Sequence, residues 1–352
     1  MEIEKDNNIN SIFNKYNDKG LTGLANCGNS CYINSCLQVL SHTYEFNIFL
    51  SDENYKKKLN KISDSVLLLE WDKLRELMWS DNCTIAPWGF IKSVQKVATL
   101  KDRDIFTGYG QNDVQEFLLF LIEAFHNSMA REVDMEIKGD VINNTDKLAK
   151  SCYEMMKNMY KKEYSEMLNI FYGIHMSVIS CKNTNENLSI RPEPFSVMSL
   201  PIPDIKNPSL IDCLNLYCKQ EILEGENAWY NDVTKTTQGV KRGIIFWSLP
   251  KILIIDLKRW NFKGEKNNTN IDIPLSVINL SKYVYGYNKK SYKYQLYGVC
   301  NHYGGSSGGH YTAYVKNANN NWYSYNDTNV DLISDEKIIS SRAYCLFFRK
   351  IK

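Results

Sequence analysis

One stretch near the N-terminus decides the fold: residues 23–35 read GLANCGNSCYINS. Apolar residues then recur at helical spacing, at Ile33, Leu37 and Leu40, so the sequence predicts a loop followed by a helix that begins at about Cys31. A thiol in the first turn of a helix lies near unpaired N–H groups and the positive end of the helix dipole, and both favour the reactive thiolate. Cys31 is therefore a candidate nucleophile.

Two other cysteines in the same segment compete with Cys31 for this role. An arbitrary cysteine is most often a small buried core residue. Cys36 lies among the apolar residues of the predicted helix, which indicates the core, whereas Cys27 lies in the loop and could be exposed. Spacing alone does not choose among the three. The loop also contains Gly28, which lets the backbone approach a substrate closely, and Asn26, whose side-chain amide is suited to stabilising an oxyanion.

A nucleophilic thiol needs a base, and the sequence has only five histidines. His310 follows SSGG at residues 306–309 and precedes the strand-like segment YTAY at residues 311–314. A glycine-rich turn before a strand leaves backbone without side chains next to the imidazole ring of His310. This suits a base that lies beside an extended peptide substrate. Taken alone, a surface turn histidine is the commoner explanation. Residues 322–327 (WYSYND) supply groups that could orient the ring across a strand pair.

The first of these segments resembles the cysteine box of the ubiquitin-specific protease family. The usual form of the box is G-L-x-N-L-G-N-T-C-Y-M-N-S, and here Cys27 replaces Leu, Ser30 replaces Thr and Ile33 replaces Met. The resemblance implies that Cys31 is the nucleophile and that Asn26 carries the oxyanion-stabilising amide.

The second segment resembles the histidine box of the same family. Residues 301–311 contain NHYGG and then GHY, similar to N-H-x-G followed by G-H-Y, and residues 322–330 are similar to W-x-x-F-x-D-x-x-V. The resemblance implies that His310 is the base and Asn326 the third member of a Cys-His-Asn triad. It also implies that Asp327 is the adjacent acidic residue that the family uses around the active site.

A third motif lies at residues 106–117, where FTGYGQNDVQEF resembles F-x-G-x-x-Q-Q-D-A-x-E-F. The match implies that Gln111 and Asp113 hold the basic C-terminal tail of the substrate, since a carboxylate pairs well with an arginine. The spacing of Asp113 and Glu116 is also that of a helix capping box, and both roles can hold at once. Beside the base, further substrate contacts are expected from Gly308, Gly309 and Tyr311.

Helical patterns come first in the chain and strand-like segments follow, which indicates an α+β fold. The family resemblance extends over nearly the whole chain. It implies a papain-like cysteine peptidase of ubiquitin-specific protease type, with a helical thumb, a β-rich palm and β fingers. We expect residues 1–19 to form a flexible N-terminal tail and residues 20–352 a single catalytic domain. Its expected parts are the thumb at about 20–170, the fingers at about 171–250 and the palm at about 251–352.

Composition excludes several other classes of protein. The formal net charge of the 352 residues is only +2, which argues against a general nucleic-acid binder. No run of 18 apolar residues is present, so we expect no membrane partner. The ten cysteines are spread widely, and the start of the chain lacks the apolar region of a signal peptide. These features predict free thiols in a reducing compartment, the cytoplasm or the nucleus.

Many family members bind structural zinc in the fingers through two C-x-x-C pairs. Here Cys181 is followed by Thr184 where the second ligand would be, and no cysteine occurs near residues 231–234. The sequence therefore predicts no metal site and no cofactor.

The resemblance predicts a deubiquitinating peptidase that acts as a monomer. Such an enzyme hydrolyses the isopeptide or peptide bond after the C-terminal glycine of ubiquitin, through a thioester acyl-enzyme. Its partners would be ubiquitin or ubiquitinated proteins. Two alternatives stay open: a protease for another ubiquitin-like modifier, and a catalytically inactive ubiquitin-binding module.

Overall fold

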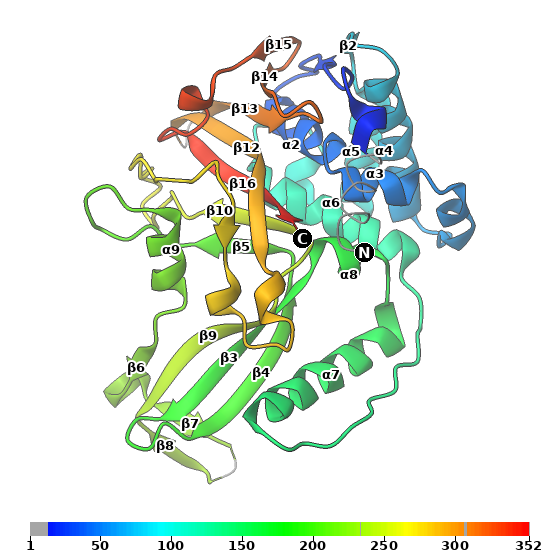
Figure 1. Ribbon diagram of the computed structural model, residues 1–352. Coiled ribbons are helices and arrows are strands. Elements are labelled where there is room, and N and C mark those ends of the chain that lie inside the picture. Colours follow the sequence, from blue (N-terminus) through cyan, green and yellow to red (C-terminus); the bar gives the residue numbers. More distant parts are fainter. Residues whose placement is uncertain (1–12, 233, 306–307, 352) are drawn as a thin grey trace.

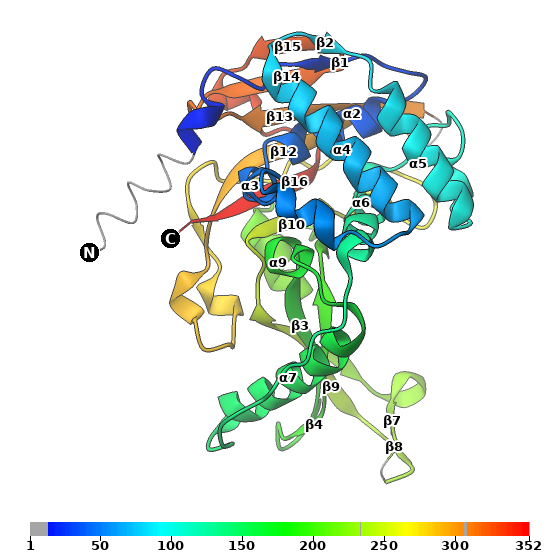
Figure 2. The ribbon, with the colours of Figure 1, turned by 90° about the vertical axis from the view of Figure 1, so that its right-hand side faces the viewer.

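The computed structural model describes residues 13–232, 234–305 and 308–351. Figures 1 and 2 show a helical part and a central sheet packed together, with a second sheet extending away from both. These are the thumb, the palm and the fingers, and the mixture of helix and sheet is the α+β class predicted from the sequence.

The palm is a mostly antiparallel sheet. Its strands follow the order β15 (Asn329–Leu332), β14 (Trp322–Asn326), β13 (Gly308–Lys316), β12 (Lys293–Gly305), β16 (Ala343–Ile351), β10 (Ile252–Leu257) and β5 (Val197–Leu200), and β11 (Ile278–Asn279) pairs with β12. Every residue of β10 is buried, as its run of β-branched and apolar side chains predicts for a central strand. Its side chains enter two cores, one toward the thumb and one on the opposite face, where α9 (Leu210–Tyr217) packs.

The thumb is built around a helix that is buried on every side. That helix, α2 (Cys31–Ser41), begins at the residue predicted from the sequence, and it packs against both β13 and the thumb helix α6 (Val114–Met129). The other thumb elements are α3 (Tyr44–Leu50), α4 (Ser63–Ser80), α5 (Trp88–Leu100) and a short parallel pair, β1 (Gly23–Leu24) with β2 (Thr84–Ile85). Because α2 is enclosed, its first turn is fixed between thumb and palm.

The fingers are a second antiparallel sheet. Its order is β4 (Asn187–Phe195), β3 (Gly173–Cys181), β9 (Val240–Ser248) and β6 (Glu221–Leu223), with a separate hairpin of β7 (Trp229–Asn231) and β8 (Thr236–Gln238). The chain enters the fingers from the thumb through α7 (Asn144–Glu163) and α8 (Met167–Phe171).

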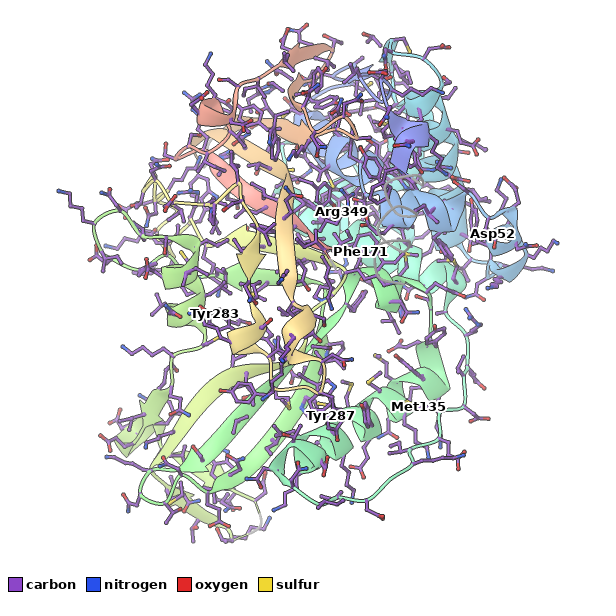
Figure 3. The ribbon with its side chains drawn as sticks, in the orientation of Figure 1. Asp52, Met135, Phe171, Tyr283, Tyr287 and Arg349 are labelled. Carbon is purple, nitrogen blue, oxygen red and sulfur yellow. The ribbon has the colours of Figure 1, made fainter. Side chains whose placement is uncertain are left out.

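The long helix α7 lies against the fingers sheet, although the expected boundary near residue 170 grouped it with the thumb (Figure 1). Its buried residues Ala149 and Cys152 share a small core with Met176 and Trp247 of the sheet. Its N-terminus is also fastened to the palm, since the Tyr287 hydroxyl, in the segment between β11 and β12, donates to Asp146 at 2.6 Å (Figure 3). An apolar stripe on this otherwise polar helix therefore determines where it packs.

The last palm strand is fastened to the thumb by Arg349 of β16 (Figure 3). Its Nε donates to Glu45 at 2.7 Å, and its guanidinium lies over the rings of Tyr44 and Tyr297 at 4.7 and 4.4 Å. An ion pair enclosed by aromatic rings loses little strength to water, so this contact stabilises the thumb against the palm.

The N-terminal segment departs from the flexible tail expected over residues 1–19. Residues 1–12 lie outside the described part of the chain. Residues Asn14–Tyr16 form a short 3-10 helix, and Tyr16 is buried. Its ring stacks on Tyr44 at 4.6 Å and meets Trp79 edge-on at 4.8 Å. Together with Phe13, whose ring lies 4.9 Å from that of Tyr44, Tyr16 thus holds a polar segment on the thumb, which its polar composition did not indicate.

Candidate active site

Cys31 is the first residue of α2, where the thumb meets the palm. Its side chain is only 3% exposed. Burial raises the pKa of the Cys31 thiol, and a hydrogen bond from the backbone N–H of Tyr311 opposes this only in part. In the free protein, burial therefore opposes the thiolate that the position at a helix start was expected to favour. The neutral thiol is the resting form, and activation requires a base.

His310 and Asn326 lie on the neighbouring palm strands β13 and β14 and contact each other directly. His310 Nε2 is 2.6 Å from Asn326 Oδ1. Because an amide oxygen only accepts, Nε2 carries the proton in this contact, and the lone pair of a neutral ring is on Nδ1. Among the described residues no hydrogen bond joins Cys31 to His310, although Cys31 approaches the N–H of Tyr311, the next residue along.

Asp327 follows Asn326 in the sequence, but its carboxylate binds the segment around Cys31 and does not bind His310. One carboxylate oxygen accepts from Asn26 Nδ2 at 3.0 Å and the other from Asn34 Nδ2 at 2.8 Å. Asp327 has a positive φ of 50°, a turn conformation that asparagine and aspartate tolerate better than most residues. The turn after β14 therefore clamps both sides of the Cys31 segment, before and after the thiol.

Asn26 is the residue expected to stabilise an oxyanion, and it is exposed and fixed in orientation. Its Oδ1 accepts from the backbone N–H groups of Gly28 and Ser30 at 3.2 and 3.1 Å. Its Nδ2 gives one hydrogen to Asp327. An amide nitrogen has two hydrogens, so a second donor remains for a ligand.

Gln111 crosses from the thumb to the palm beside His310. Its Nε2 donates to the Gly309 carbonyl at 2.9 Å, and its Oε1 accepts from the Gly309 N–H at 2.8 Å. Gly309 also has no room for a side chain, since a Cβ there would lie 2.4 Å from His302 Nε2 and 2.5 Å from the Tyr303 carbonyl. Gln111 thus bridges the thumb and the palm beside His310, and the neighbouring Gly308 is exposed beside this bridge.

Asp113 forms the N-cap of α6, but within the described residues no bond from the Glu116 side chain back to Asp113 completes the capping box that the spacing suggested. Its Oδ1 accepts from the backbone N–H groups of Gln115 and Glu116 at 2.7 and 3.3 Å. Its Oδ2 accepts from the hydroxyls of Tyr344 and Tyr311, at 2.5 and 3.5 Å. The carboxylate expected to hold a basic tail is therefore already oriented by the helix and by two tyrosines.

Sequence reasoning missed a second carboxylate next to Asp113. Asp256 on β10 is 7% exposed, and its Oδ1 has no hydrogen-bond partner among the described residues. Burial, and then the charge of Asp113, raise its pKa to about 7. The sequence did contain one indication of it, because Asp256 occupies the position at which the family motif L-P-x-I-L-I-I-H-L-K-R-F has a histidine.

His302 and Tyr344 complete this part of the site. The His302 ring lies 4.6 Å from that of Tyr311 and 5.7 Å from that of Tyr344. Burial, together with the charge of Lys266, lowers the pKa of His302 to about 4, so this ring is neutral at pH 7. A neutral histidine in an aromatic cluster packs beneath Gly309, and it is not a second base.

Within the described residues, no group of three or more histidine, cysteine, aspartate or glutamate side chains is arranged to hold a metal ion. Over the same ranges, no helix combines the length and the apolar character that crossing a membrane requires.

Comparison with known proteins identifies the family. A sequence profile described as ubiquitin carboxyl-terminal hydrolase matches residues 22–348. The chain therefore belongs to the ubiquitin carboxyl-terminal hydrolase family, and the resemblance predicted from its motifs is confirmed.

Several relatives are about one-third identical to this chain over the aligned residues. Ubiquitin carboxyl-terminal hydrolase 2 of Gallus gallus is 33% identical, over 94% of this chain and 93% of its own length. Ubiquitin carboxyl-terminal hydrolase Usp2 of Drosophila melanogaster is 32% identical over 94% of this chain, and hydrolase 2 of Homo sapiens is 32% identical over 95%. The matched regions are 35% and 56% of those two proteins, so the chain spans about a third to a half of their length.

A solved structure of similar fold is the SAGA DUB module containing Ubp8, bound to monoubiquitin. The match has a TM-score of 0.73 and 24% identity, and it covers 95% of this chain and 70% of that one. At this identity the likeness shows the fold alone.

Proposed function

We propose that this chain is a deubiquitinating cysteine peptidase that uses Cys31, His310 and Asn326. The observation that carries the proposal is the 2.6 Å contact between His310 and Asn326 beside a cysteine at the start of a buried helix. Family membership supports the same activity. The reaction is hydrolysis of the isopeptide or peptide bond after the C-terminal glycine of ubiquitin.

The first half of the reaction forms a thioester. His310 Nδ1 takes the proton of the Cys31 thiol, and the thiolate attacks the carbonyl carbon of the terminal glycine. The negative charge moves to the carbonyl oxygen, where the second Nδ2 hydrogen of Asn26 stabilises it. His310 then gives its proton to the leaving amine, the C–N bond breaks, and the glycine carbonyl remains bonded to Cys31.

The second half releases the product. A water molecule gives a proton to His310 and attacks the thioester, and the C–S bond breaks as His310 returns that proton to the sulfur. The products are the Cys31 thiol and a carboxylic acid, which loses its proton to water. Asn326 keeps Nε2 protonated throughout, so Nδ1 is the nitrogen that exchanges protons. Asp327 acts as a positioning residue, because it orients Asn26 through one oxygen and the start of α2 through the other.

The proposed substrate is an extended tail that ends in two glycines. Bound beside Gly309, such a tail needs the backbone groups that Gln111 occupies in the free protein, so Gln111 must release Gly309 when substrate binds. The Cys31–His310 pair, which is not hydrogen-bonded here, would close in the same step.

The experiment is hydrolysis of ubiquitin that carries a fluorogenic amide at its C-terminus. We expect turnover by the wild-type chain and none by Cys31→Ala or His310→Ala, with unchanged melting temperatures. Equivalent substrates made from other ubiquitin-like modifiers are run in parallel. Turnover of one of those alone would assign a different modifier, whereas tight ubiquitin binding without turnover would make the chain a binding module.

A further inference from the structure

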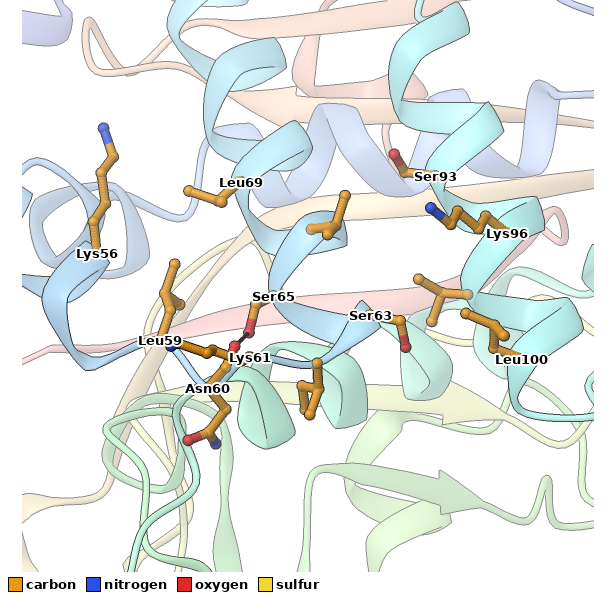
Figure 4. A pocket seen from close by; sticks show the side chains of 13 residues that line it. Lys56, Leu59, Asn60, Lys61, Ser63, Ser65, Leu69, Ser93, Lys96 and Leu100 are labelled. Carbon is orange, nitrogen blue, oxygen red and sulfur yellow. Dashed lines mark hydrogen bonds between the residues drawn. The ribbon is translucent and has the colours of Figure 1, made fainter.

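Outside the site, a hollow lies on the surface of the thumb. We call it the α4–α5 groove. It has a volume of ≈ 620 Å³, and it lies between the start of α4, the end of α5 and the loop before α4. Figure 4 shows Leu69 on α4 and Lys96 on α5 among the side chains that line it. Its apolar lining consists of Leu59, Ile62, Val66, Leu69, Val97 and Leu100. It includes none of the residues placed in the candidate active site.

Three of the six apolar side chains that line the groove are open to water. Ile62, Val66 and Leu100 are 45%, 44% and 63% exposed. Clustered apolar residues of this size on a soluble surface mark sites where another molecule binds, because burying them releases about 25 cal/mol per Å². They form a concave surface between two helices, which is the shape that receives the apolar face of a third helix.

The unpaired charges beside the groove are positive. Lys61 and Lys96 line it, and neither has a salt-bridge partner among the described residues. The acidic residues close by are already paired: Asp64 with Lys101 at 2.8 Å and Glu53 with Lys56 at 2.7 Å. The free charges that face a ligand are therefore positive, and they would attract carboxylates.

The floor of the groove is held in place before anything binds. Ser65 Oγ donates to the Asn60 carbonyl at 2.6 Å, a contact drawn in Figure 4. The Asn60 side chain donates to the carbonyls of Asn127 and Ala130 at 2.9 and 2.8 Å. The loop is thereby fastened to the end of α6, so a ligand does not have to order it.

We propose that the α4–α5 groove docks an acidic amphipathic helix of a partner protein. Leucine, isoleucine or phenylalanine side chains at helical spacing would enter between α4 and α5, and flanking aspartates or glutamates would pair with Lys61 and Lys96. A lipid surface would also find lysines around apolar residues, but a flat membrane fits a concave groove poorly. This docking function does not depend on the peptidase activity.

The test is selection of a displayed library of random 16-residue peptides on the full chain, with Lys61→Glu/Lys96→Glu as the counter-selection. We expect acidic peptides with apolar residues three and four positions apart. A selected peptide should bind the charge-reversed variant at least 10-fold more weakly and should lose affinity as salt is raised. The matched control is Lys147→Glu/Lys161→Glu on α7, which makes the same change in net charge at exposed positions away from the groove and should bind like wild type.

Other results would overturn the proposal. These are no enrichment, peptides that bind the variant as well as wild type, or peptides whose binding survives Val66→Asp. Binding of the wild-type chain to phosphatidylserine vesicles that the groove variant loses would assign the surface to a membrane. Concentration-dependent dimerisation lost in the variant would assign it to a second copy of the chain. Melting temperature and ubiquitin hydrolysis should match wild type in every variant, which separates this test from that of the peptidase.

Discussion

The Gln111 side chain pairs with both backbone groups of Gly309, at 2.8 Å to the N–H and 2.9 Å to the carbonyl. These bonds join a thumb loop to the palm strand that carries His310. They also satisfy the backbone donor and acceptor of the residue directly before the proposed base.

Replacing Gln111 should loosen this bridge. We expect Gln111→Ala to speed hydrogen exchange at the Gly309 amide by about 5-fold, since one lost hydrogen bond is worth about 1 kcal/mol. Hydrogen exchange followed by mass spectrometry measures it. Gln95→Ala is a matched control, because Gln95 bonds the carbonyl of Gly108 in the same thumb segment. Equal protection of Gly309 in both variants would mean that the bridge does not persist in solution.

Asn326 should matter for chemistry more than for binding. We expect Asn326→Ala to lower kcat on the fluorogenic ubiquitin substrate by about 100-fold with little change in KM, because the imidazole loses its orientation. Asn326→Asp keeps an acceptor and should retain most of the rate. Asn329→Ala, at the paired position of β15, should behave as wild type. A large rise in KM for Asn326→Ala alone would place this residue in substrate binding.

Asp327 and Asn26 should act as one unit. Asp327→Ala frees the Asn26 amide and removes an acceptor from Asn34, so we expect kcat/KM to fall by about 100-fold and the melting temperature to drop. In a double-mutant cycle with Asn26→Ala, the two losses should be far from additive, with a coupling of about 1 kcal/mol or more. Additive losses would show that Asp327 acts through some other contact.

Asp256 should make the stability of the chain depend on pH. Burial beside Asp113 raises its pKa from 3.8 to about 7, so the folded protein binds this proton more tightly than the unfolded chain does. The stability that this group contributes is complete below about pH 4 and is lost as pH rises through about 7.

Asp256→Asn removes that dependence at nearly constant shape. The melting temperature of the variant relative to wild type should therefore be higher at pH 8 than at pH 5, by several °C at about 2–4 °C per kcal/mol. Asp331→Asn, at an exposed position on β15, is the control. A difference that stays constant between the two pH values would contradict an elevated pKa for Asp256.

The sequence predicted best those features that depend on nearby residues. The start of α2 at Cys31 follows from the spacing of Ile33, Leu37 and Leu40. The contact of His310 with Asn326 spans only 16 residues across adjacent strands. The helical repeat of apolar residues fixes the start of α2, and the register of two adjacent strands fixes the contact of His310 with Asn326.

Contacts between distant loops could not be predicted in the same way. Gln111 and Gly309 are 198 residues apart, and Asn26 and Asp327 are 301 apart. No periodicity shows that such loops will meet. Tyr16 in the predicted tail and the raised pKa of Cys31 were missed for a related reason, since both depend on burial by residues far along the chain.

The most direct test of the central claim is reaction of the purified chain with ubiquitin whose C-terminus carries a thiol-reactive warhead. We predict a single covalent adduct, whose mass equals that of the chain plus the probe. It should be mapped to Cys31, absent in Cys31→Ala and still formed when Cys27 or Cys36 is replaced. A well-folded sample that forms no adduct with this probe, or one whose adduct persists in Cys31→Ala, would contradict the account.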